Sequence, residues 1–317
     1  MLMAAKKKSN IYPVMRQFPL LMNGTPDTNA IIRVDRALGA INHRLYRQSR
    51  MYTAKVDMDA DAPSGTTVDV WALCDTWWLH KAYRLAFETF MENSKEERGQ
   101  AGTSLGRWND FRVDTGLGTA FQKDLLPSGN LVPTGTAQIF GTGTDTEYLM
   151  SEVHDSGGAR RTFVFSGGTT ATEYDVITEY DNTANTDETP STPANLASYD
   201  GLTDEIDQGQ KEHLTQDGNL PPYKANTLEG AVWIKVATLN VAAAGTQKLS
   251  TGFFKAPAGL IAVVSSTPLG DATLLNLEVK GGDYKGVHAP SMLDQKGGAV
   301  YASSSKSSSA RHNVRIR

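Results

Sequence analysis

The last two thirds of the chain is divided into short apolar runs separated by turn-forming residues. After Gly99 come segments such as "RWNDFRVDT", "GTAQIFGTG", "RRTFVFSGG" and "GLIAVVSS", cut by Gly, Thr, Asp or Ser. Alternation over a few residues predicts strands, because successive side chains of a strand point to opposite faces of a sheet. The spacing of the turn signals predicts roughly eight to eleven strands. Regular short strands favour an all-β sandwich or barrel over a sheet with crossover helices.

One segment has a different period. In "CDTWWLHKAYRLAFETFMENSKEERG" the apolar side chains recur three and four residues apart, as along one face of a helix: Leu79, Tyr83, Ala86, Phe87 and Phe90. Asp75 and Thr76 are residue types that begin helices, and a charged turn before Gly99 ends one. The pattern predicts an amphipathic helix over about residues 75–98, inserted in the β domain. The tryptophan pair at its start is expected to anchor the first turn or a subunit contact.

Composition separates four regions of the chain. Residues 1–34 mix Lys, Pro, Asn and Gly around a short apolar patch and predict an extended basic arm. The main β domain is expected over residues 35–300, with a polar, Pro-containing excursion at about 181–225. Residues 301–317 are rich in Ser and basic residues and predict a flexible basic tail.

Two short stretches need separate treatment. Residues 35–50 place Leu38, Ile41 and Leu45 on one helical stripe, yet they equally suit a direct lead into the strand "MYTAKVDMD". In the arm, the patch "FPLLM" would be an aggregation hazard if a monomer exposed it. We therefore expect its apolar side chains to bury against neighbouring subunits: Phe18, Leu20, Leu21 and Met22.

A single cysteine in 317 residues excludes an internal disulfide framework and any multi-cysteine zinc site. No apolar run approaches the roughly 20 residues that a membrane span requires, so no membrane span is expected. The start of the chain, "MLMAAKKKSN", has no apolar stretch after its lysines and does not suit a secretory signal. We expect folding in a reducing, cytosol-like compartment.

Charge is unevenly distributed along the chain, although the net charge is only −4. Ten basic residues occur up to Lys55 against two acidic ones, Asp27 and Asp35, whereas the last 17 residues add four basic residues and no acid. The middle of the chain is strongly acidic. Such polarity favours a molecule with one face toward an anionic partner. The simpler alternative, that charged ends only keep the chain soluble, is equally open.

Basic side chains toward the two ends are the candidate nucleic-acid contacts, because flexible Lys and Arg segments neutralise phosphates without a defined structure. They are Lys6, Lys7, Lys8, Arg16, Arg44, Arg47, Arg50, Arg311, Arg315 and Arg317. The aromatic interleaving of a sequence-reading module is absent. Binding is therefore expected to be weak and non-specific.

Cys74, Asp75 and His80 are the residue types of a cysteine-nucleophile site. A nucleophilic cysteine needs an imidazole within hydrogen-bond reach and a third group to orient that imidazole. Cys74 closes a predicted strand while His80 lies one turn into the following helix, so the spacing does not bring them together. We expect Cys74 to be a small core residue, Asp75 to cap the helix and His80 to lie on its flank. No catalytic residue is expected.

Asp57, Asp59 and Asp61 alternate like the start of a calcium loop. The glycine that an EF-hand requires at loop position six is Ala62, and the bidentate glutamate at position twelve is Val68, so an EF-hand is excluded. A weak cation site at a subunit interface and a simple acidic hairpin turn both stay open.

Other cofactor and active-site signals are missing from the sequence. The six histidines have no ligand spacing, and the Gly-rich stretches "GTGTDTE", "SGGTT" and "KGGDYKG" lack the Lys-Ser/Thr ending of a phosphate loop. We therefore expect turns there, and neither a metal nor a cofactor. Carboxylate pairs for glycoside hydrolysis are assembled in space and leave no local spacing, so the sequence does not test them.

The order of these features resembles that of viral jelly-roll capsid proteins. A short basic arm precedes the arginine-rich "HRLYRQSRMYTAKVDMD", then come the strand and helix of "VDVWALCDTWWLHKAYRLAFETFMENSKEERG", "RWNDFRV", and paired strands around "FFKAPAGLIAVVSS". Over about residues 40–290 the chain is most similar to capsid proteins of small circular single-stranded DNA viruses. The resemblance implies an eight-stranded jelly roll that self-assembles into an icosahedral shell, with its basic ends toward the viral nucleic acid. It also implies a protein made in the interior of a host cell and located in the virion.

Three alternatives accompany this interpretation. Three consecutive lysines are few beside the long arginine-rich arms of many such viruses, which keeps open the double jelly-roll major capsid protein of a membrane-containing phage. A β-sandwich carbohydrate-binding or adhesin module is the second alternative, and a β-sandwich hydrolase the third. For a shell, we expect the acidic stretch at 181–220 to face outward, because the genome side should be cationic.

Overall fold

The computed structural model describes most of the chain between residues 13 and 294. The described residues are 13–22, 27–60, 62–104, 106–121, 123–131, 137–139, 148–154, 158–168, 172–184, 228–241, 247–269 and 275–294. The expected basic tail at 301–317, most of the polar excursion at 181–225 and the first 12 residues of the arm lie outside them.

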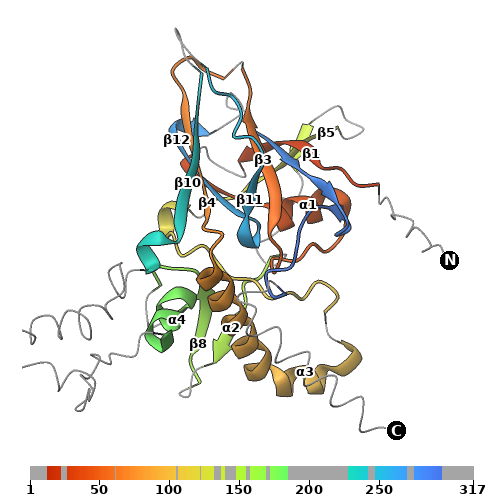
Figure 1. The fold of residues 1–317 in the computed structure, drawn as a ribbon. Helices are drawn as coiled ribbons and strands as arrows, with labels where there is room; N and C mark the ends of the chain where they lie inside the picture. The colour runs from red at the N-terminus through yellow and green to blue at the C-terminus, as the bar shows by residue number, and fades with distance from the viewer. Residues whose placement is uncertain are drawn as a thin grey trace, which may run out of the picture.

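Two antiparallel sheets face each other across one core (Figure 1). The first has the strand order β11-β3-β13-β1-β5-β6 and the second the order β10-β4-β12-β2. The strands of the first sheet are β1 (Gln17–Met22), β3 (Tyr52–Met58), β5 (Leu125–Leu131), β6 (Ala137–Ile139), β11 (Phe254–Ala256) and β13 (Leu275–Val279). Those of the second sheet are β2 (Asp27–Arg33), β4 (Thr67–Leu73), β10 (Trp233–Asn240) and β12 (Leu260–Leu269). The expectation of a mostly antiparallel, all-β sandwich is confirmed.

In the sandwich, the first strand in the sequence pairs with the last, and each later strand pairs with one progressively nearer the middle of the sequence. β1 pairs with β13, β2 with β12, β3 with β11 and β4 with β10, all antiparallel. β13 also pairs with β3, and β12 with β4, which joins these pairs into two four-stranded sheets. β5 and β6 extend the first sheet beyond β1.

Alternating side chains of the strands fill the space between the two sheets. In β3, Tyr52, Ala54, Val56 and Met58 are buried and the residues between them are partly exposed. This is the period of two that follows when one face of a strand packs inward. Val68 and Val70 of β4, Leu275 and Leu277 of β13, and Ile261 and Val263 of β12 belong to the same core.

The prediction of an arm over residues 1–34 is wrong for the part that forms β1 and β2. Phe18, Leu20 and Met22 are buried in the core of their own chain, not against a neighbouring subunit. The strand accommodates Pro19, although proline lacks the N–H that a central strand donates. Its pairing with β5 begins only at Leu20, so Pro19 has a register partner in β13 alone.

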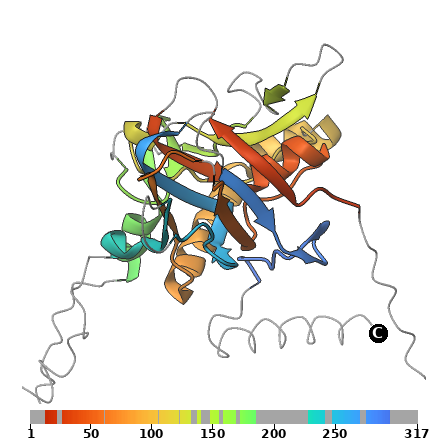
Figure 2. The same ribbon diagram turned by 90° about the horizontal axis from the view of Figure 1, so that it is seen from above.

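The helical alternative for residues 35–50 applies to their first half. α1 (Val34–Asn42) ends at His43, whose φ of 49° is left-handed, and an extended loop leads from there to β3. The side chain of Leu38 in α1 is buried in the core and that of Ile41 packs against the same core, whereas Leu45 lies beyond the end of the helix. Seen from above, β5 lies alongside α1 (Figure 2).

A second core lies below the sandwich, around α2 (Trp77–Asn93), which is followed by α3 (Lys95–Ala101). Leu79, Tyr83 and Ala86 of α2 are buried. Phe111 packs against the ring of Tyr83, with ring centroids 5.3 Å apart, and against that of Phe90 at 5.2 Å. The core is completed by a small sheet, β7 (Glu152–His154), β8 (Arg160–Val164) and β9 (Glu173–Asp175), and by α4 (Val176–Ala184).

Candidate nucleic-acid interface

One end of the first sheet gathers basic residues from three distant parts of the sequence. β13 runs antiparallel to both β1 and β3, with Glu278 opposite Gln17 and Val279 opposite Ala54. The end of β13 therefore lies beside the beginnings of β1 and β3. We call the basic side chains at this place the basic edge: Arg16, Arg44, Arg47, Arg50, Lys280 and Lys285.

The turn after β13 holds the basic edge together. Tyr46 donates its hydroxyl hydrogen to the carbonyl oxygen of Lys285 at 3.1 Å, and the ammonium of Lys285 donates to the carbonyl oxygen of Leu45. The backbone N–H of Arg47 donates to the hydroxyl of Tyr284 at 3.1 Å, and the guanidinium of Arg50 lies 4.3 Å from the centre of the Tyr284 ring. Cation–π contacts of this kind fix the direction of a guanidinium without neutralising it.

The lowered pKa of Lys285 reflects its partial burial and the positive charges that surround it at the basic edge. Partial burial lowers its pKa, and the nearby guanidiniums of Arg47, Arg44 and Arg50 lower it further. One carboxylate opposes them, because Arg47 donates to buried Asp110 at 3.1 Å while half of the Arg47 side chain remains exposed. Asp283 of the same turn is an exposed acidic neighbour.

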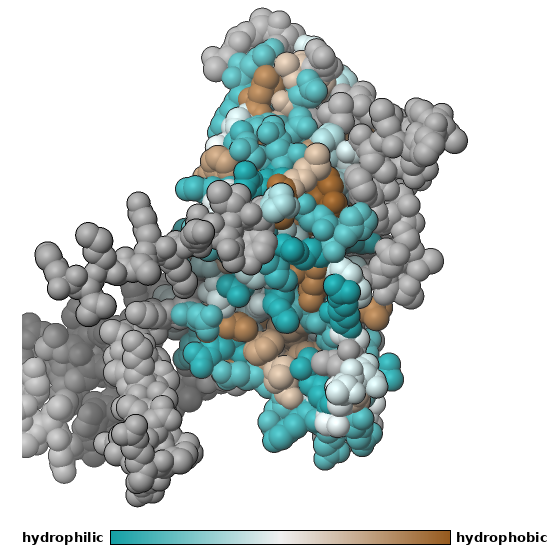
Figure 3. All heavy atoms as spheres, turned by 90° about the vertical axis from the view of Figure 1, so that its right-hand side faces the viewer, coloured by the Kyte–Doolittle hydropathy of each residue, from teal (hydrophilic) through white to brown (hydrophobic). Residues whose placement is uncertain are grey.

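A hollow of about 360 Å³ borders the basic edge. Arg16 and Lys280 line it together with the exposed ring of Phe253. Glu278 also lines it, but its carboxylate is paired with Lys55 at 2.6 Å. Figure 3 shows the side of the molecule to the right in Figure 1, where hydrophilic side chains surround isolated apolar ones.

The structure brings together only the predicted contacts near the sheet. Arg16, Arg44, Arg47 and Arg50 meet at the basic edge, whereas the others lie outside the described residues: Lys6, Lys7, Lys8, Arg311, Arg315 and Arg317. Sequence reasoning missed Lys280 and Lys285, because "KGGDYKG" was interpreted only as a turn. Lys280 and Lys285 reach the basic edge because β13 pairs with β1 and β3. This pairing joins distant parts of the sequence, so no local sequence pattern indicates it.

Two arginines of the N-terminal charge excess are neutralised inside the molecule. Arg33 lies 2.7 Å from a carboxylate oxygen of Asp114 and 3.1 Å from one of Asp124, and Arg36 contacts the second oxygen of Asp124 at 2.5 Å. Burial lowers the pKa of Arg33, but Asp124 and Asp114 outweigh burial and raise it overall. These arginines stabilise the fold and are not available to an external anion.

Asp35 is a buried carboxyl group beside this ion-pair network. The hydroxyl of Tyr148 donates to its Oδ2 at 2.5 Å, and no described residue is a hydrogen-bond partner of its Oδ1. The guanidinium of Arg112 lies 4.3 Å from the centre of the Tyr148 ring. Burial raises the pKa of Asp35 to about 6, against the opposing effects of Tyr148 and Arg112.

Cys74, Asp75 and His80 do not form a nucleophilic site in the described geometry. Cys74 is buried, its Sγ lies 3.3 Å from the hydroxyl of Thr76, and burial raises its pKa. The expected cap by Asp75 is wrong, since α2 has no side-chain cap. Asp75 instead binds Nε2 of His80 at 2.8 Å and Nζ of Lys255 at 2.5 Å.

The acidic hairpin does not gather a cation site in the part of the chain that is described. Asp57 is paired with Lys55 at 2.9 Å, and Asp61 lies outside the described residues. No group of three or more potential metal ligands occurs among the described His, Cys, Asp and Glu side chains. No described helix is long and apolar enough to cross a membrane.

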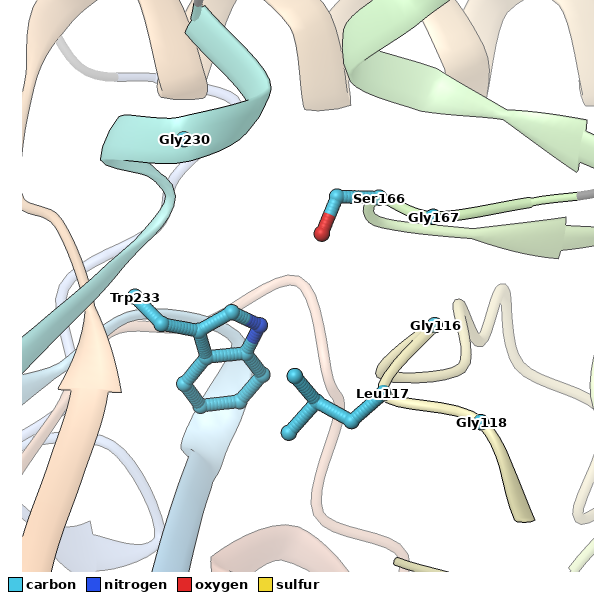
Figure 4. A pocket seen from close by; sticks show the side chains of 7 residues that line it. All are labelled: Gly116, Leu117, Gly118, Ser166, Gly167, Gly230 and Trp233. Atoms are coloured by element: carbon cyan, nitrogen blue, oxygen red, sulfur yellow. The ribbon is translucent and has the colours of Figure 1, made fainter. Parts of the chain in front are cut away.

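A hollow of about 670 Å³ lies between the second core and the start of β10 (Figure 4). It is lined by Gly116, Leu117, Gly118, Ser166, Gly167, Gly230 and Trp233. None of these side chains ionises near neutral pH, so the described part of the lining offers no general acid or base.

Comparisons of the chain with protein families, with curated proteins and with solved structures find no match.

Replacing Asp35 with Asn is predicted to stabilise the protein at neutral pH. The folded-state pKa of Asp35 is raised from 3.8 to about 6, so the folded state holds the proton more tightly than the unfolded state. Stability from this group is therefore greatest below about pH 4 and falls as the pH rises to 6. At pH 7, Asp35→Asn should raise the free energy of unfolding by roughly 3 kcal/mol, with little difference at pH 4.

Urea denaturation of both proteins from pH 4 to 8 measures this difference. Asp283→Asn, at an exposed carboxyl group, is the matched control and should follow the wild type at every pH. An Asp35→Asn protein that is less stable than the wild type at pH 7 contradicts the prediction.

Gly116→Ala is predicted to separate the segment at 114–118 from the small sheet. A Cβ on Gly116 would overlap the backbone carbonyl of Ser166, which cannot move aside as a flexible side chain would. Gly118 has nearly the same φ, +73° against +72°, and open space around it. Gly116→Ala should cost roughly 3 kcal/mol or more, and Gly118→Ala about 1 kcal/mol from the left-handed backbone alone. Equal midpoints of the two variants in thermal unfolding would contradict the clash.

Proposed function

We propose that this protein is a viral coat protein, a jelly roll that self-assembles into an icosahedral shell and encloses nucleic acid. The observation that carries the proposal is the order of strand pairing. A jelly roll is a long antiparallel hairpin rolled up, so its first strand pairs with its eighth, the second with the seventh, the third with the sixth and the fourth with the fifth. The pairs β1–β13, β2–β12, β3–β11 and β4–β10 follow this order. Jelly rolls are common in viral capsids, and they also occur in lectins and cupins.

A single roll accounts for the described strands better than a double one. The eight strands of the four pairs make one complete roll, and β7, β8 and β9 form a separate three-stranded sheet. In this proposal the chain between β4 and β10, including α2, is an insertion between the fourth and fifth strands.

The described surface does not favour the alternative of carbohydrate binding. A sugar-binding sandwich needs aromatic side chains grouped on one sheet face, whereas the most exposed aromatic rings lie on α2 (Trp77), in a loop (Trp108) and in the turn before β11 (Phe253). These rings lie on three separate elements, so they do not make an aromatic platform for a sugar.

The basic edge is the proposed contact with nucleic acid. The side chains of Arg16, Lys285 and Arg50 are held by backbone or ring contacts, and several basic side chains of the edge remain exposed. Positively charged grooves beside an aromatic ring suit single-stranded nucleic acid, whose phosphates bind cations and whose bases stack. The hollow beside Arg16, Lys280 and Phe253 has this composition.

Electron microscopy of the purified full-length protein tests the shell directly. We expect closed particles of uniform diameter under some combination of salt and pH between 5 and 8. A protein that stays monomeric or dimeric throughout this range, by microscopy and by light scattering, is not a shell protein.

Neutralising two side chains of the basic edge is predicted to weaken binding of single-stranded DNA. In Arg16→Gln/Lys280→Gln, two phosphate contacts are lost, so affinity should fall about tenfold at low salt. The slope of log K against log salt should decrease by about 1.4. Fluorescence anisotropy with a labelled oligonucleotide of mixed sequence measures both quantities.

The control variant is Arg160→Gln/Lys248→Gln, which removes two exposed basic residues from β8 and from the segment after β10. It should leave the slope within about 0.3 of the wild-type value. Equal effects of the two double variants would assign binding to net charge and contradict a localised interface.

A further inference from the structure

The exposed face of α2 carries apolar and charged side chains in an ordered arrangement. We call it the α2 outer face; it consists of Trp77, Lys81, Arg84, Leu85, Glu88, Met91 and Glu92, all exposed. It lies opposite the buried stripe of the helix, which includes Leu79, Tyr83 and Ala86. Trp77 is 64% exposed, although a tryptophan side chain is mostly apolar.

The two tryptophans that begin α2 therefore have different roles. Trp78 packs against the second core, and Trp77 points away from it. The sequence left open whether the pair anchors the helix or a subunit contact. Trp78 anchors the helix, so a separate explanation is needed for Trp77.

Charge changes sign once along the α2 outer face. Lys81 and Arg84 lie in its first half, and Glu88 and Glu92 in its second half. Arg84 and Glu88 contact each other at 2.9 Å within the helix, but both side chains remain more than half exposed. The carboxylate of Glu88 can therefore accept a second cation. Lys81 lies 5.6 Å from the centre of the Tyr180 ring, a contact that leaves its charge in place.

We propose that the α2 outer face binds the α2 outer face of a second copy of this chain, with the two helices antiparallel about a two-fold axis between Arg84 and Leu85. This contact rests on the proposed self-assembly and specifies one of its subunit contacts. The register places Lys81 opposite Glu88 of the partner, and Glu88 opposite Lys81 of the partner. Trp77 then lies against the end of the partner helix, at Met91 and Glu92.

Three physical arguments favour this arrangement. A two-fold contact must be self-complementary, and a face whose charge reverses about its middle is complementary to itself only when antiparallel. A parallel pair would bring like charges together, and it would also align the two helix dipoles unfavourably. Tryptophan is enriched among the residues that contribute most to protein–protein binding.

The contact is expected to be weak in isolation. One helix pair covers less than the roughly 1,600 Å² of a standard stable interface. It therefore needs the additional contacts of an assembly to be fully occupied, and a covalent trap is the most direct probe.

Cysteine cross-linking of the full-length protein tests the register. In Lys81→Cys/Glu88→Cys the two new thiols face each other across the axis, so mild oxidation should convert most of the protein into a disulfide-linked dimer. Each single variant places its cysteines about 10 Å apart along the helices and should not cross-link. The native Cys74 is buried and does not interfere.

The control is Glu88→Cys/Glu92→Cys on the same exposed face, because its nearest thiols across the axis, the two at position 88, lie about 10 Å apart along the helices in the proposed register. Cross-linking of this pair but not of the Lys81/Glu88 pair would overturn the proposed register. Failure of both pairs, in a protein that folds as judged by its circular dichroism, would overturn the contact itself.

Charge reversal provides a second test that does not depend on cysteine geometry. Lys81→Glu should lower the apparent association constant roughly tenfold, because the two-fold axis doubles the effect of each change. Glu88→Lys should do the same, and the double reversal should restore association to within threefold of the wild type. No recovery in the double variant contradicts the pairing of these two residues.

The outcomes separate this contact from the shell proposal. If particles form but the Lys81→Cys/Glu88→Cys variant does not cross-link, the shell proposal is supported and the α2 contact is contradicted. Cross-linked dimers that never form particles would support the contact and remove the shell.

Discussion

The buried guanidinium of Arg33 is the interaction on which the arrangement of the whole molecule depends. Arg33 ends β2 and lies at the entrance to α1, and it binds two carboxylates from residues that follow α2, Asp114 and Asp124. Removing one partner of a buried ion pair leaves an uncompensated charge, which typically costs about 3–5 kcal/mol. Asp114 also forms backbone hydrogen bonds to Phe163 and Phe165 of the second core. The network thus fixes the position of the second core relative to the sandwich.

The internal network also determines which basic residues are available outside. Arg33, Arg36 and Lys55 form ion pairs with carboxylates within the chain, whereas Arg16 and Lys280 are exposed at one end of the first sheet. A count of charges along the sequence does not distinguish the two groups. The location of positive potential is instead a result of which strands pair.

Strands and helices with strong periodicity were predictable from the sequence, and features that depend on distant pairing were not. The alternation in β3 and the helical stripe of α2 are local patterns, and each marks the element that the structure contains. β1 was missed because the mixed composition of residues 1–34 was interpreted as an arm, although Phe18, Leu20 and Met22 alternate along the strand. The partners of Arg33 lie 81 and 91 residues away along the chain, and no local spacing indicates them. The same reason explains why Lys285 was not placed beside Arg47.

The segment that begins at Lys123 runs beside β2 and β1, the neighbouring outer strands of the two four-stranded sheets. The carbonyl oxygen of Lys123 accepts a hydrogen bond from the N–H of Ile31 in β2, and β5 then continues along β1. One short segment therefore pairs with the end of β1 and also bonds to the outer side of β2 at Ile31. An unpaired strand edge invites a second chain to add a strand, and such addition is hard to reverse. In the proposed assembly, a neighbouring copy could not add a strand directly to β1, and side-chain contacts at this place would respond to salt and pH and would let misplaced subunits dissociate and rebind.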